Sequence, residues 1–144
     1  MMRVKLLKTG NYLIAALMAL LGFSVSCENS TRVEYGTPSA KFILKGKITS
    51  SETDIPIENI RIIMQSDTAY SDADGNYQVV DKWGFPSDQT YLVQFQDFDG
   101  IANGTFAALD TLVEYKDPVF TDGDGKWYEG ETSKEFNVRM KSGK

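Results

Sequence analysis

The chain has 144 residues, which is the size of one ordinary domain. It contains no histidine and one cysteine, so it has no Ser-His-Asp triad, no Cys-His dyad, no Cys-x-x-Cys pair and no thiolate zinc site. Its 20 acidic and 15 basic residues give a net charge of −5. This balance argues against nucleic acid as a partner, because phosphates need a basic surface. The composition predicts a protein that is not an enzyme.

Residues 1–26 have the organisation of an export signal. Three cations, Arg3, Lys5 and Lys8, precede an uncharged apolar run over residues 13–23. This run is shorter than the ~20 residues that span a bilayer, and its length suits the core of a signal peptide. We therefore expect residues 1–26 to be a signal peptide.

The only cysteine directly follows this segment. Residues 24–26 (Ser-Val-Ser) precede Cys27, and the arrangement resembles the lipobox of bacterial lipoproteins, although Ser24 stands where Leu is usual. The resemblance implies that Cys27 is lipidated and anchors the protein to a membrane of the bacterial cell envelope. It leaves the leaflet open, and with it the choice between the periplasm and the cell surface. The alternative is an ordinary secretory signal followed by an unrelated cysteine.

Residues 27–40 are polar and include Gly36 and Pro38, which predicts a flexible tether between the membrane and a folded domain. Removal of residues 1–26 takes away three cations and no anions, so the net charge changes from −5 to −8. The mature chain cannot form an internal disulfide, and its core alone must hold the fold.

Apolar residues recur with a period of two over residues 41–144, as at Phe42, Leu44 and Ile48. This is the period of half-buried β-strands, and turns rich in Gly, Asp, Asn and Pro separate the apolar segments. The pattern predicts an all-β domain, a small antiparallel sandwich of seven strands. The predicted strands are 42–49, 59–65, 68–71, 76–80, 90–96, 109–116 and 134–141.

Three segments between residues 42 and 79 support a first resemblance: GKIT at 46–49, IPIENIRI at 55–62 and YSDADGNY at 70–77. Together they look like a transthyretin-like or carboxypeptidase-regulatory-like domain. The resemblance implies an immunoglobulin-like or transthyretin-like sandwich.

A second resemblance covers almost the whole chain. YGTP at 35–38, DFDG at 97–100 and DGKWY at 124–128 occur in this order after the lipobox, and the set resembles the radical-SAM-associated lipoprotein family. The resemblance implies a radical SAM protein as genetic neighbour and candidate partner. It suggests a non-catalytic binding or accessory module, or alternatively a substrate that the radical SAM protein modifies. One cysteine cannot itself ligate an iron–sulfur cluster.

Asp-x-Asp-Gly tetrads begin at Asp72, Asp97 and Asp122. None continues as an EF-hand loop, but a composite calcium site would suit such oxygen ligands. If successive strands alternate in direction, the first two tetrads share one end of the sandwich, and a calcium-dependent adhesion-type module becomes an alternative function. The simpler interpretation is turn chemistry, in which Asp forms Asx-turns and Gly supplies a positive φ. The candidate ligands are Asp72, Asp74, Asp97 and Asp99.

Aromatic residues gather in two predicted loops at the opposite end. They either pack on the end of the sandwich or form a surface for an unidentified partner. The candidate interaction face consists of Trp83, Phe85, Trp127 and Tyr128.

Overall fold

The computed structural model describes residues 11–14, 16–17 and 36–144. Residues 11–14 and 16–17 are helical, and within the described residues no helix has the length and apolar character needed to cross a membrane. The predicted lipidation site Cys27, the predicted cleavage site and the first part of the predicted tether lie outside the described residues. The chain divides into two compact units, Met1–Tyr35 and Gly36–Lys144.

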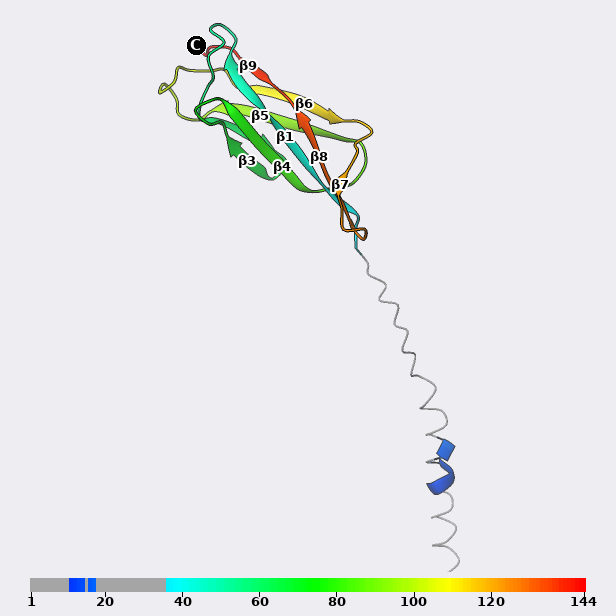
Figure 1. The fold of residues 1–144 in the computed structure, drawn as a ribbon. Helices are drawn as coiled ribbons and strands as arrows, with labels where there is room; N and C mark the ends of the chain where they lie inside the picture. Colours follow the sequence, from blue (N-terminus) through cyan, green and yellow to red (C-terminus); the bar gives the residue numbers. More distant parts are fainter. Residues whose placement is uncertain (1–10, 15, 18–35) are drawn as a thin grey trace, which may run out of the picture. The chain divides into compact units, whose positions relative to one another are not determined.

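The second unit is a sandwich of two β-sheets (Figure 1). One sheet has the order β4-β1-β8-β7, with β9 also paired to β1, and the other has the order β3-β2-β5-β6. The predicted all-β sandwich is therefore confirmed. The strands are β1 (Ser39–Ser50), β2 (Ile60–Met64), β3 (Asp67–Tyr70), β4 (Asn76–Gly84), β5 (Gln89–Asp97), β6 (Leu109–Tyr115), β7 (Thr121–Asp122), β8 (Tyr128–Glu135) and β9 (Val138–Met140).

The core lies between the two sheets. It consists of every second residue along the strands, as the alternation of apolar residues in the sequence predicts. Burial of these side chains supplies the main driving force of folding, at about 25 cal/mol for each Å² of apolar surface. Phe42 is at the centre of an aromatic cluster, in which its ring packs edge-on against Tyr115 at 5.1 Å and against Phe120 at 5.5 Å. The predicted inward residues that are buried include Phe42, Leu44, Ile48, Ile60, Ile62, Met64, Tyr77, Val79, Tyr91, Val93, Phe95, Val113, Tyr115, Val138 and Met140.

Three core tyrosines place their hydroxyl groups on oxygen acceptors. Tyr115 donates to the carbonyl oxygen of Ile43 at 2.8 Å, and Tyr91 donates to a carboxylate oxygen of Asp81 at 2.9 Å. Tyr77 donates to the carbonyl oxygen of Phe136 at 2.6 Å. Burial raises the pKa of each tyrosine, and for Tyr91 the hydrogen bond to Asp81 raises the pKa further.

The strand pairing differs from a seven-stranded, purely antiparallel sandwich in one region. The predicted strand over 134–141 is two strands, β8 and β9, and both pair with β1 in parallel. The predicted loop over 116–131 contains β7 and the start of β8. Gly130 is the only buried residue of β8, so this strand has no apolar alternation to reveal it. At the other end of the domain sequence, β1 begins at Ser39, inside the predicted tether.

Gly46 lies opposite the break between β8 and β9. Lys45 pairs with Glu135 and Ile48 pairs with Val138, so the register is unchanged across the break. The N–H of Phe136 donates to the carbonyl oxygen of Lys45 at 2.8 Å. Its carbonyl group lies so close to Gly46 that an added Cβ would be 2.6 Å from the carbonyl carbon. Glycine is required here because Phe136 approaches the backbone of β1.

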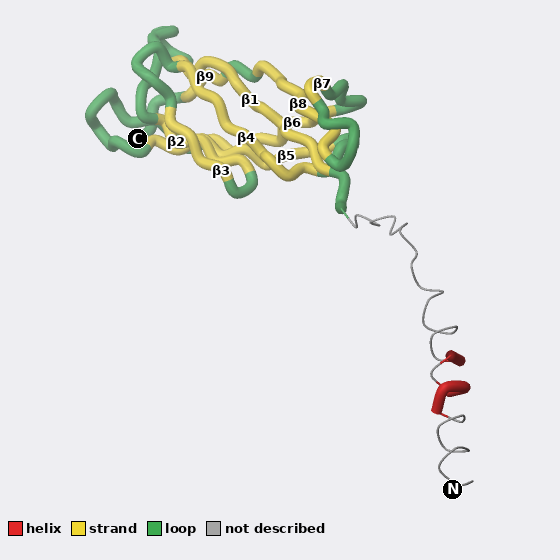
Figure 2. The backbone as a smooth tube through the Cα atoms, turned by 60° about the horizontal axis from the view of Figure 1, so that its bottom comes forward, coloured by secondary structure: helices red, strands yellow, loops and turns green. Residues whose placement is uncertain are grey.

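The loops gather at the two ends of the sandwich (Figure 2). We call the end at which the chain enters the domain through Gly36 the near end. There the N–H of Ser39 donates to the carbonyl oxygen of Trp127. The other end is the far end, where Ile48 N–H donates to the carbonyl oxygen of Gly75 and β1 finishes.

Candidate functional site

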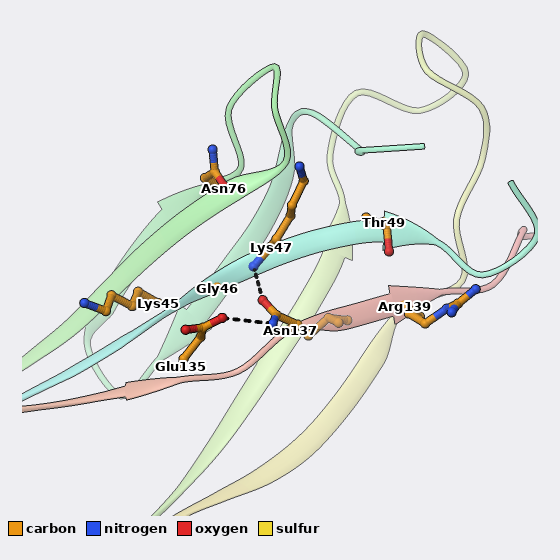
Figure 3. A pocket seen from close by; sticks show the side chains of 9 residues that line it. Lys45, Gly46, Lys47, Thr49, Asn76, Glu135, Asn137 and Arg139 are labelled. Atoms are coloured by element: carbon orange, nitrogen blue, oxygen red, sulfur yellow. Dashed lines mark hydrogen bonds between the residues drawn. The ribbon is translucent and has the colours of Figure 1, made fainter. Parts of the chain in front are cut away.

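A surface hollow of about 610 Å³ lies beside the break between β8 and β9 (Figure 3). Lys45, Lys47 and Arg139 line it, but their side chains point away from one another. Arg139 is paired with Asp54 at 2.5 Å. Since the cations do not converge, the hollow presents no focused anion site.

The far end carries an exposed aromatic pair. The rings of Tyr70 and Phe98 are 5.4 Å apart and meet at 65°, and they are 48% and 59% exposed respectively. The guanidinium of Arg61 lies over the Phe98 ring at 5.3 Å, and its Nη2 donates to Gln96 at 2.5 Å. We call Arg61, Tyr70, Gln96 and Phe98 the far-end aromatic surface.

Strand register brings these residues together. Arg61 is the cross-strand partner of both Tyr70 on β3 and Gln96 on β5, so the three side chains form one row across the outer face of the sheet. Phe98 follows Gln96 by two residues and joins the same face. Sequence reasoning missed this surface because its members come from three segments. The signal that could have revealed it is the outward position of Tyr70 and Arg61 in their strands.

The loop that carries Phe98 is fixed by Asp99. One carboxylate oxygen of Asp99 accepts hydrogen bonds from the side-chain amides of Asn59 at 3.3 Å and Asn103 at 2.8 Å. In addition, a carboxylate oxygen of Asp97 accepts from the N–H of Phe106 at 2.9 Å. These bonds hold the loop against the end of β2 and limit the entropy that Phe98 would lose on contact with a partner.

The first and third Asp-x-Asp-Gly tetrads form tight turns. Oδ1 of Asp72 accepts from the N–H groups of Asp74 and Asn76 at 3.0 and 2.8 Å, and Gly75 has a φ of 77°. Oδ1 of Asp124 likewise accepts from the N–H groups of Lys126 and Tyr128. Turn chemistry therefore accounts for these two aspartates.

The predicted calcium ligands do lie at one end. The N–H of Ser71 donates to the carbonyl oxygen of Ile60, and Ile60 pairs with Asp97 on the other side, so Asp72 and Asp97 flank the same end of β2. Within residues 36–144, however, no three His, Cys, Asp or Glu side chains are placed to hold a metal ion. Asp72 and Asp124 serve their own turns, whereas Oδ1 of Asp97 is buried and accepts no hydrogen bond. Calcium binding stays an alternative that no observation tests.

The predicted interaction face lies at the near end. Gly84, which follows Trp83, pairs with Ala40, and Trp127 accepts the hydrogen bond from Ser39. Trp83 belongs to β4 and not to a loop. Both tryptophans are exposed, with 80% of Trp83 and 39% of Trp127 accessible, and Phe85 is 53% exposed. Tyr128 is half-buried.

The comparisons with known proteins place few constraints on the chain. No protein-family model matches the sequence, and no curated protein matches it. The fold is similar to the crystal structure of a proposed carbohydrate-binding protein from Bacteroides uniformis, with 18% identity and a TM-score of 0.35. The alignment covers 72% of this chain and 41% of that protein, so the chain spans less than half of its neighbour's length. This likeness is too distant to bear on function.

Proposed function

We propose that the protein is an exported lipoprotein, anchored through Cys27 in the bacterial cell envelope, whose sandwich is a non-catalytic binding module. The export signal and the single cysteine directly after it support the anchor. The lack of histidine in the sequence supports a binding role over catalysis. A radical SAM protein as genetic neighbour and candidate partner is implied by the resemblance of the sequence motifs.

The far-end aromatic surface carries the proposal, and the ligand we assign to it is a protein. Tyrosine and arginine are enriched among the few residues that dominate protein–protein binding energy. Here both contact Phe98, whose position is fixed by Arg61 and by the loop around Asp99. A surface that is ordered before binding loses little conformational entropy on binding. It also faces away from the near end, where the chain enters.

The test is capture of partners by the acylated protein from its native membrane. We expect Phe98→Ala to weaken binding of the captured partner about thirtyfold, which corresponds to a typical hot-spot loss. The matched control is Leu112→Ala, because Leu112 is 65% exposed on the outer face of the same sheet. Equal losses for both variants, or a captured ligand that is a carbohydrate, would remove the proposed protein-binding site.

The anchor has its own test. Cys27→Ser should leave the protein soluble, and retention of this variant in the membrane fraction would refute the lipid anchor. Mass spectrometry of the mature protein should show acylation of Cys27 and no other modification. A second modification would instead support the alternative that the chain is a substrate of its radical SAM neighbour.

A further inference from the structure

Four exposed apolar side chains belong to segments that meet at the near end and have no role in the far-end aromatic surface. Trp83 and Val119 are 80% and 79% exposed, and Phe85 and Trp127 add two further exposed rings. We call Trp83, Phe85, Val119 and Trp127 the near-end apolar face. Exposed apolar groups concentrated in one region mark a contact surface.

The backbone beneath this face is held by hydrogen bonds. The N–H of Asp117 donates to Asp88 at 2.8 Å, which ties the loop after Phe85 to the loop before Val119. The carbonyl oxygen of Phe85 also accepts from the side chain of Gln89 at 3.0 Å. The face is therefore built into the sandwich by cross-loop contacts.

The chain leaves the domain across this same face. A Cβ added at Gly36 would lie 2.7 Å from the ring of Trp127, so the backbone at Gly36 passes directly against the ring. Gly36 lies nine positions after Cys27, and nine residue steps span at most about 32 Å even when fully extended. A lipid at Cys27 therefore keeps the near end within that distance of the bilayer surface.

We propose that the near-end apolar face rests on the lipid bilayer and fixes the orientation of the sandwich. This inference depends on the lipid anchor of the proposed function. Tryptophan suits the position because its amphipathic ring is favoured at membrane–water interfaces. With the near end against the lipid, the far-end aromatic surface is presented away from the membrane.

The charge around the face identifies the kind of lipid. Residues 81–88 and 116–131 contain seven acidic and three basic residues. An acidic rim is repelled by anionic headgroups, and the usual basic attraction to such lipids is missing here. The contact is therefore apolar, and zwitterionic headgroups fit it.

Tryptophan fluorescence reports on this face alone, because Trp83 and Trp127 are the only two tryptophans in the chain. The acylated protein is placed in phosphatidylcholine vesicles with or without bromine atoms on the acyl chains. We expect a blue shift of the emission and a loss of intensity in the brominated vesicles. Replacement of half of the lipid by phosphatidylglycerol should reduce the loss, and an equal or greater loss would overturn the assignment to neutral lipid.

Two variants keep both tryptophans and separate docking from mere tethering. The double variant Phe85→Ser and Val119→Ser removes apolar side chains from the face and should restore most of the intensity. Leu112→Ser removes an exposed apolar side chain away from both ends and should leave the quenching unchanged. Identical quenching in the wild type and the double variant would overturn the proposal.

Failure of the anchor and failure of docking are distinguishable. The mature chain 27–144 can be coupled through Cys27, its single cysteine, to a maleimide-bearing lipid in the same vesicles, which bypasses cellular acylation. Quenching of the coupled chain supports docking even if the native protein proves not to be acylated. A coupled chain whose tryptophans are unquenched by bromine and accessible to aqueous iodide would refute docking while leaving the anchor intact.

Discussion

Replacement of Gly46 by alanine tests whether the segment between β8 and β9 is fixed over β1. The new Cβ would lie 2.6 Å from the carbonyl carbon of Phe136 and would overlap its oxygen. The carbonyl group cannot turn aside freely, because it accepts the hydroxyl of the buried Tyr77 at 2.6 Å. To relieve the overlap, residues 136–137 must move away from β1.

The cost follows from the bonds that this movement breaks. Phe136 N–H would lose the carbonyl oxygen of Lys45, Tyr77 would lose its acceptor, and the N–H of Lys47 would lose the side chain of Asn137. At a net contribution of about 0.5–1.5 kcal/mol for each hydrogen bond, the free energy of unfolding falls by about 3 kcal/mol. For a domain of this size, the Tm then falls by about 12–24 °C.

Urea and thermal unfolding of residues 27–144, followed by circular dichroism, measure this change. Two variants bracket the result. Lys47→Ala alters an exposed side chain and keeps the N–H, so its free energy of unfolding should stay within about 0.5 kcal/mol of the wild type. Asn137→Ala removes one bond of the three and should cost about 1 kcal/mol. If Gly46→Ala unfolds within 0.5 kcal/mol of the wild type, the approach of Phe136 to β1 does not constrain the fold.

Three further predictions concern the core and the far end. Burial raises the pKa values of Tyr77, Tyr91 and Tyr115 in the folded chain, so the unfolded chain releases these protons first, above about pH 10. The free energy of unfolding is therefore at its full value below that pH and declines above it. The decline is about 1.4 kcal/mol per pH unit for each tyrosine, and constant urea stability between pH 9 and 11 would contradict it. Ser71→Ala should lower the free energy of unfolding by about 1–3 kcal/mol, because the buried hydroxyl donates to the carbonyl oxygen of Ile57 at 2.8 Å and accepts from the N–H of Ile60 at 2.9 Å. Urea unfolding measures this change, and Thr68→Ala at an exposed position is the control. The Tm should be the same with millimolar calcium as with a chelator, since no three acidic side chains among residues 36–144 are placed to hold a metal ion. A calcium-dependent rise in the Tm would revive the adhesion-type alternative.

The sequence predicted those strands whose inner face is apolar. β2 and β5 were found because Ile60, Ile62 and Phe95 alternate with polar residues and are fully buried. Residues 128–133 of β8 were missed because the pairing of this strand depends on backbone contacts: Gly130 is its only buried residue. A strand that joins a sheet without contributing side chains to the core leaves no period in the sequence.

The candidate sites divide in the same way. The turns at Asp72 and Asp124 were predictable because an Asx-turn is a contact between residues two to four positions apart. The far-end aromatic surface was not, because Arg61 meets Tyr70 and Phe98 only after β2, β3 and β5 are in register. The residue types at each end can be read from the sequence, but which side chains are neighbours depends on the register of the strands.

The parallel pairing of β1 with β8 and β9 has a consequence for the order in which the domain is made. Residues Ser39–Ser50 form one ladder with the nearby β4, but their other edge is completed by Tyr128–Met140, about ninety residues later. Such distant contacts form late and slow the folding of a chain. Until Tyr128–Met140 have been made, one edge of β1 has no partner strand, and closure of this sheet waits for β8 and β9.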